Sequence, residues 1–208
     1  MSTDERKSSV KEIRANRFVL EDENGKPRAL LCVANGAPGL ALLDENGKPR
    51  AGLSVSKDEP LLALRDENGM PRAMLGVSKD GPGLMLRDEN GNIRAFLGTV
   101  NGKAALMLSD ENGKVRASLS VSKDGAWLEL RHENGKPAVW VAVTDYEAKL
   151  LLLDKNGKER AELSLLNGQP MLYLSDQNQN PRARLVVVED GPAMSLSDEN
   201  DKEIWRAP

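Results

Sequence analysis

Aliphatic residues alternate with small or polar residues in short runs along most of the chain. In residues 49–56, for example, Ala51, Leu53 and Val55 alternate with arginine, glycine and serine. Spacing by two predicts β-strands with one apolar face, because successive side chains of a strand point to opposite sides. No segment has the 3.6-residue period of a helix. The pattern therefore predicts an all-β fold.

The alternating runs recur with a constant period of 22 residues, marked by the tetrapeptide "DENG" or a variant of it. A constant period without insertions predicts an array of identical modules, here nine units of two strands each. We assign residues 1–17 to a polar lead-in and residues 18–208 to the array, whose last unit is incomplete. Numbered from the first marker residue as zero, the units start at Asp22, Asp44, Asp66, Asp88, Asp110, His132, Asp154, Asp176 and Asp198.

Large aliphatic residues at fixed positions of the unit define one apolar face of the predicted sheet, which we call the Leu face. Leucine occupies positions −4 and −2, and alanine, leucine and valine follow at +7, +9 and +11. The predicted core of self-association comprises Leu40, Leu42, Leu53, Val55, Leu62, Leu64, Leu75, Val77, Leu84, Leu86, Leu106, Leu108, Leu119 and Val121.

Two turns separate the strands of each unit. In the DENG turn, we expect the aspartate to accept backbone hydrogen bonds and the glycine to take a positive φ. Pairing position −2 with +7 keeps both apolar side chains on one face, which predicts a four-residue loop "ENGK". The three-residue loop with a bulged glycine would break that agreement.

The second turn carries Asn-Gly or Asp-Gly, which are typical of tight hairpins. Pairing +11 with +18, as in Val55 with Leu62, places Asp-Gly at the tip of the turn. A proline follows several of these turns and lacks the N–H that would close a two-residue hairpin. We therefore expect an open turn or a corner between sheets.

Three architectures fit this pattern: an elongated antiparallel meander, a triple β-helix or prism of three chains, and a single-chain β-solenoid. A solenoid would stack the marker aspartates and the arginines at +6 on their own kind at about 4.8 Å, whereas a meander doubles that spacing. Like charges repel roughly twice as strongly at the shorter distance. Charge therefore favours the meander over the solenoid.

The Leu face requires a cover, because burying one leucine contributes roughly 1.5–3 kcal/mol. With no helix available, we expect copies of the chain to cover it, a trimer being favoured over a two-layer dimer. Incomplete units at both ends of the array leave unpaired strand edges, which promote strand addition. A filament joined end to end is therefore a further hypothesis.

Composition narrows the remaining classes of function. A net charge of −3 gives no reason to expect nucleic acid as a partner, and no apolar stretch is long enough for membrane insertion. The single cysteine, Cys32, excludes an intrachain disulfide. The polar first residues lack the apolar region of a signal peptide, which favours the cytoplasm, with non-classical export as the alternative. No motif predicts a cofactor, and the exposed carboxylates and single histidine do not predict an enzyme.

The unit at His132 departs most from the consensus and is the candidate binding site. It adds Trp127, Trp140 and Tyr146, and the hairpin register places the two tryptophans diagonally adjacent on the face opposite the Leu face. Exposed aromatic pairs suit contacts with carbohydrate or protein, and they equally suit local packing. DENG also presents oxygen atoms that calcium could bind, but the longer series of a calcium loop is missing, so we predict no metal site.

The "DENGKxRAxLxV…DGxxLxL" unit resembles repeats of uncharacterised bacterial proteins, from Phe18 to Ala207. More loosely, the pattern is similar to the trimeric β-stalks of phage tail fibres. The resemblance implies a β-rich structural element and supplies no catalytic residues.

Overall fold

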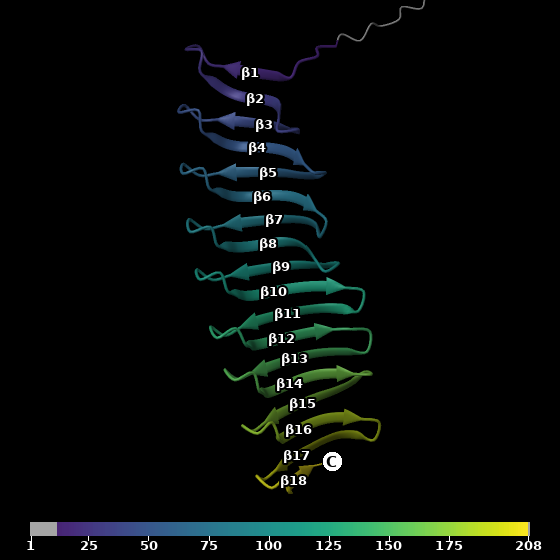
Figure 1. Cartoon of the computed structure of the whole chain (residues 1–208). Coiled ribbons are helices and arrows are strands. Elements are labelled where there is room, and N and C mark those ends of the chain that lie inside the picture. The colour runs from purple at the N-terminus through teal and green to yellow at the C-terminus, as the bar shows by residue number, and fades with distance from the viewer. Residues whose placement is uncertain (1–11, 208) are drawn as a thin grey trace, which may run out of the picture.

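The computed structural model describes residues 12–207, so residues 1–11 of the predicted lead-in and Pro208 lie outside the described residues. The chain forms a single antiparallel sheet of 18 strands, with no helix in residues 12–207 (Figure 1). The strands are β1 (Arg17–Glu21), β2 (Pro27–Ala34), β3 (Ala37–Leu43), β4 (Pro49–Ser56), β5 (Glu59–Arg65), β6 (Pro71–Ser78), β7 (Gly81–Arg87), β8 (Ile93–Val100), β9 (Lys103–Ser109), β10 (Val115–Ser122), β11 (Gly125–Arg131), β12 (Pro137–Val143), β13 (Glu147–Leu153), β14 (Glu159–Leu166), β15 (Gln169–Ser175), β16 (Pro181–Val188), β17 (Gly191–Ser197) and β18 (Glu203–Ala207).

Each strand from β2 to β17 pairs antiparallel with the strands before and after it in the chain, and β1 and β18 pair with one neighbour each. The strands lie like the rungs of a ladder, with β1 and β18 at opposite ends, the DENG turns along one long edge and the second turns along the other (Figure 1). This arrangement confirms the all-β elongated meander. The solenoid alternative is wrong, because its coils would place equivalent residues of successive units on neighbouring strands.

The DENG turn is tighter than predicted. Position −2 pairs with +7, as in Leu42 with Ala51, which was expected. However, the Asp44 N–H donates to the Lys48 carbonyl at 3.0 Å, which leaves a three-residue loop with Gly47 at φ 76°. A register shift beside Leu43 and Pro49 then makes up for the shorter loop, so that Leu42 still pairs with Ala51. The four-residue loop was wrong because a tight loop and an adjacent β-bulge together preserve the same alternation.

The second turn is a closed two-residue hairpin, so the predicted open turn or corner is wrong. Ser56 pairs with Glu59, and Val55 pairs with Pro60 instead of Leu62. Lys57 and Asp58, with φ of 49° and 67°, therefore form the tip. In such a hairpin the pair next to the closing pair exchanges no hydrogen bond. Pro60 lies in that position, so this turn requires no N–H from it.

Side-chain burial differs between the two faces of the sheet. Every buried apolar residue of the chain's described part, except Leu151, is an alanine, and all of them lie on the face opposite the Leu face, which we call the second face. Ala63, Ala142 and Leu151 retain 5%, 2% and 5% of their exposure there. The Leu face remains exposed. A one-layer sheet has no second layer to enclose large side chains.

Candidate interaction surfaces

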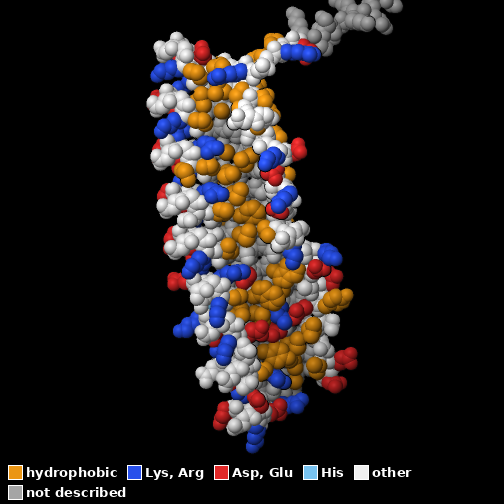
Figure 2. Space-filling model, viewed as in Figure 1, with side chains coloured by type: hydrophobic (Ala, Val, Ile, Leu, Met, Phe, Trp, Pro, Cys, Tyr) orange, Lys and Arg blue, Asp and Glu red, His pale blue; other side chains and the backbone are white. Residues whose placement is uncertain are grey.

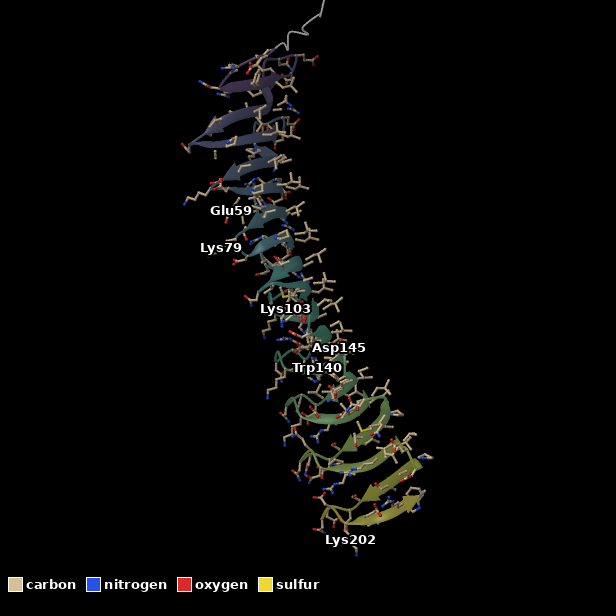
Figure 3. All side chains as sticks on the ribbon, turned by 90° about the vertical axis from the view of Figure 1, so that its right-hand side faces the viewer. Glu59, Lys79, Lys103, Trp140, Asp145 and Lys202 are labelled. Atoms are coloured by element: carbon tan, nitrogen blue, oxygen red, sulfur yellow. The ribbon has the colours of Figure 1, made fainter. Side chains whose placement is uncertain are left out.

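The Leu face carries no charged side chain in any of the 18 strands. Cross-strand pairs such as Leu53 with Leu62 and Leu75 with Leu84 continue this face from one unit to the next. All 14 residues of the predicted association core keep between 36% and 51% of their surface exposed. In Figure 3, aliphatic side chains project in a row from one side of the ribbon. The face is a continuous apolar surface on a single chain.

The DENG turns are internally satisfied by the carboxylate of their first residue. In the second unit, one oxygen of Asp44 accepts the N–H groups of Asn46 and Lys48, both at 2.9 Å. The other oxygen pairs with the guanidinium of Arg50. These bonds lower the pKa of Asp44, the Lys48 N–H having the largest effect, and they outweigh the partial burial that raises it. The turn oxygens are thus occupied by the chain itself.

In six units, the arginine at position +6 joins the DENG turn to the next one. Arg72 pairs with Asp66 of its own unit at 3.3 Å and donates to the carbonyl of Arg87 in the following turn at 3.1 Å. Arg94 and Arg116 donate to the corresponding carbonyls of the next units, Ser109 and Arg131, both at 3.0 Å. These arginines therefore bind neighbouring units together.

Lysine at position +4 forms a second connection between turns. Lys48, Lys114 and Lys158 each direct Nζ at a carbonyl of the following turn, at 3.4, 3.4 and 2.9 Å. The recurrence of lysine and arginine at fixed positions was the sequence signal for both connections. A further signal was that the marker aspartate and the arginine are lost together, at His132 and Ala138.

The second face changes character halfway along the array. From β2 to β10 its central positions are uncharged, and from β11 to β16 they include Glu129, Lys149, Glu162 and Arg184. Figure 2 shows a hydrophobic stripe that acidic and basic side chains interrupt in its lower part. Lys149 pairs with Glu147 at 2.7 Å and lies 3.6 Å from Glu162. Charged side chains therefore occupy the centre of the second face only in this later part.

Glycines bring three strands of the uncharged part close together. Gly83 pairs with Gly76 on β6 and with Gly98 on β8, and the ring of Phe96 lies against both Gly83 and Gly98. A hollow of about 730 Å³ lies beside these glycines, lined partly by Leu61 and Met85. It is shallow and open, and its polar groups lie mainly on the second turns.

The predicted aromatic site is divided in the structure. Trp127 pairs with Ala142 and Glu129 pairs with Trp140, which confirms that the tryptophans are diagonal neighbours on the second face. Both rings are half-buried, and Lys103 Nζ lies 5.2 Å from the centre of the Trp127 ring. A pair of fully exposed rings is therefore absent here.

His132 and Tyr146 lie on opposite long edges of the sheet, in a DENG turn and a second turn respectively. His132 Nε2 lies 3.4 Å from the carbonyl of Leu153, and Tyr146 keeps 75% of its surface exposed. The four predicted binding residues thus do not form one cluster. Recognition of carbohydrate or protein by the two tryptophans stays a prediction.

Residues 12–207 contain no cluster of three or more His, Cys, Asp and Glu side chains that could hold a metal ion. Within the same span, no helix has the length and apolar character needed to cross a membrane. No protein-family model matches the sequence, and no curated protein sequence matches it either. The resemblance to bacterial repeat proteins and phage fibre stalks therefore stays a prediction.

Proposed function

We propose that this chain is a structural rod whose Leu face associates with the Leu faces of further copies. The observation that carries the proposal is the uncharged aliphatic surface that crosses all 18 strands. The marker aspartate and the arginine at +6 bond within the chain, so these turn groups already have partners. Identical copies suit this face because every unit repeats the same side chains at the same spacing.

The available area is sufficient for a stable assembly. Strands spaced ~4.8 Å apart give an 18-strand sheet about 85 Å long, and a band ~15 Å wide offers roughly 1,300 Å² per copy. A standard interface buries about 800 Å² per partner. Exposed apolar patches on monomers rarely exceed a few hundred Å². The size of the Leu face therefore supports burial by another chain.

Three copies suit the width of the sheet. Strands of seven or eight residues are ~25 Å long, so a triangular prism with such walls places each wall about 7 Å from its axis. Packed sheets lie ~10 Å apart, that is about 5 Å on each side. Leucine side chains at the centre of each wall can fill the additional space. A trimer is therefore favoured, with the two-layer dimer as the alternative.

Sedimentation equilibrium of the full chain tests the proposal. We expect a trimer, or whole multiples of it where trimers join end to end, and a double variant Leu62→Gln/Leu84→Gln should dissociate, with its dissociation constant raised about 100-fold or more because two buried leucines per copy are lost. The matched control Lys57→Gln/Lys79→Gln changes second turns and should leave the mass unchanged. A wild-type monomer at ~50 μM, well above the Kd expected for an interface of this size, would contradict the proposal.

A further inference from the structure

We infer that the two ends of the sheet are complementary, so that β18 of one molecule adds to β1 of a second copy and the meander continues. This inference deepens the proposed rod function, but it concerns the ends of the rod instead of its Leu face. Within the described residues, β1 pairs only with β2 and β18 pairs only with β17. Each end therefore presents a strand edge with unpaired backbone groups.

Strand direction permits the junction. Strands alternate in direction along the meander, and the sheet has 18 of them. Because this number is even, β18 and β1 run in opposite directions, as antiparallel neighbours must. A second copy translated along the sheet axis would also keep its Leu face and its DENG edge aligned with those of the first. The contact is head-to-tail, so it repeats without closing.

The backbone groups at the two ends match in register. On β2, the N–H of Val33 points toward β1, where it contacts the Asn16 carbonyl at 3.5 Å. Alternation then directs Phe18 and Leu20 toward β2 and leaves the N–H and C=O of Val19 on the free edge. By the same alternation, the N–H and C=O of Arg206 lie on the free edge of β18. Internal junctions of this type pair +8 with −3, as Gly52 pairs with Ala63, and Arg206 and Val19 occupy these two positions.

The side chains at the ends depart from the consensus in complementary ways. Internal junctions place leucine at +9 against leucine at −4, as in Leu53 with Leu62. The end junction would place Ala207 against Phe18, a smaller residue against a larger one. Trp205 takes the place of the usual alanine at +7 and would face Leu20. Phe18, Leu20 and Trp205 are 44%, 65% and 46% exposed in the single chain, so contact would bury apolar surface on both sides.

One internal junction of the array already lacks the arginine at +6 that would also be missing where two molecules join. Ile204 replaces the arginine at +6, so the strongest connection between turns is missing there. The unit at His132 also lacks this arginine, yet the array continues, and Lys136 reaches the next turn at Asn156 with a distance of 2.8 Å. Lys202 has the same position in the last unit as Lys136 in its own. The sheet therefore continues across a junction that lacks the arginine, where lysine and other side chains of the turn make the connection.

Proline substitutions test each end separately. Val19→Pro and Arg206→Pro remove the outward N–H, which edge strands tolerate because that side faces solvent. In electron micrographs of the full chain, wild type should give rods in multiples of ~85 Å, and each variant should give single rods. Val19→Thr and Arg206→Lys keep the N–H and should still elongate. Circular dichroism verifies that each variant is folded.

An equimolar mixture of the two proline variants distinguishes the ends. Each variant retains one intact end, and these two ends are complementary. The mixture should therefore form rods of two molecules joined end to end, and no longer rods. Wild-type rods of a single length at ~100 μM, or elongation that persists in both proline variants, would overturn the inference. If one variant does not fold, the other tests the same junction. Rod length reports on the ends and rod width on the Leu face, so the two proposals can fail independently.

Discussion

In six of the nine units, the carboxylate that opens the DENG turn has three partners: two backbone N–H groups within the turn and the arginine at +6. Its role as a backbone acceptor follows from the tetrapeptide alone, since aspartate at the first position of a type I turn does this in many proteins. The bond from the arginine to the next unit does not follow from the tetrapeptide. Binding the carbonyl of the next unit depends on the distance between neighbouring turns, which only the antiparallel pairing of the strands determines.

The aspartates make the stability of the array dependent on pH. The ordinary pKa near 3.8 is lowered in the folded chain for Asp22 and Asp44, chiefly by the N–H groups of Lys26 and Lys48. A lowered pKa means that the folded state binds the proton less tightly than the unfolded state. The stabilisation is therefore complete above the ordinary pKa and is lost as the pH falls through the lowered value.

We expect Asp44→Asn to reduce the urea midpoint of unfolding at pH 6, and the difference from wild type should shrink by about half or more near pH 3. Asparagine keeps a backbone acceptor but loses the charge that pairs with Arg50. The control Asp124→Asn changes a second-turn carboxylate that accepts no hydrogen bond within the described residues, and it should show no such convergence. A difference that stays constant with pH would exclude the ionised carboxylate as the cause.

At the scale of elements, the strands were predictable and their turns were only partly so. Alternation fixes which residues share a face, and the observed pairs Leu42–Ala51 and Leu64–Ala73 follow from it. It does not fix the loop, because a bulge after the DENG turn and a shift of two residues at the second turn both leave the faces unchanged. The true register at the second turn required knowing that proline tolerates the non-hydrogen-bonded position.

The glycine row on β6, β7 and β8 provides a test of strand packing. A Cβ atom on Gly98 would lie 2.5 Å from the Pro82 carbonyl oxygen and 2.8 Å from the Gly83 Cα, and backbone atoms cannot move away easily. We expect Gly98→Ala to lower the free energy of unfolding by ~1–3 kcal/mol. Gly52→Ala is the matched control, since its Cβ would meet nothing closer than 3.5 Å. Urea denaturation of both variants measures the difference, and equal midpoints would refute this account of the row.

At the scale of the whole molecule, the sequence indicated the array and its apolar face but not the nature of the opposite face. The central second-face positions of β2 to β10 are filled by glycine, alanine, serine, methionine and single large apolar residues, which read as polar or neutral spacers when taken one unit at a time. Their shared lack of charge becomes visible only when they lie side by side. The exposure of the Leu face is likewise a property of the single sheet, which no local pattern determines.

Because each strand contacts only its two neighbours, a whole unit should be removable without loss of the fold. Deleting residues 66–87 joins Arg65 to Asp88 and places β5 beside β8. Leu64 then meets Ala95, the pairing that positions −2 and +7 have throughout the array, and Ala63 meets the larger Phe96. We expect an intact all-β spectrum and a sheet shorter by ~9.6 Å, measured by circular dichroism and small-angle X-ray scattering.

A deletion shorter by one residue, 66–86, is the matched control. It leaves one extra residue before the turn, so the Leu faces on the two sides of the junction would point to opposite sides of the sheet. This variant should lose β-structure or unfold at a clearly lower urea concentration than the 22-residue deletion. Equal behaviour of the two variants would mean that alternation across the turns does not hold the array in register, and collapse of both would show that the units are not independent modules.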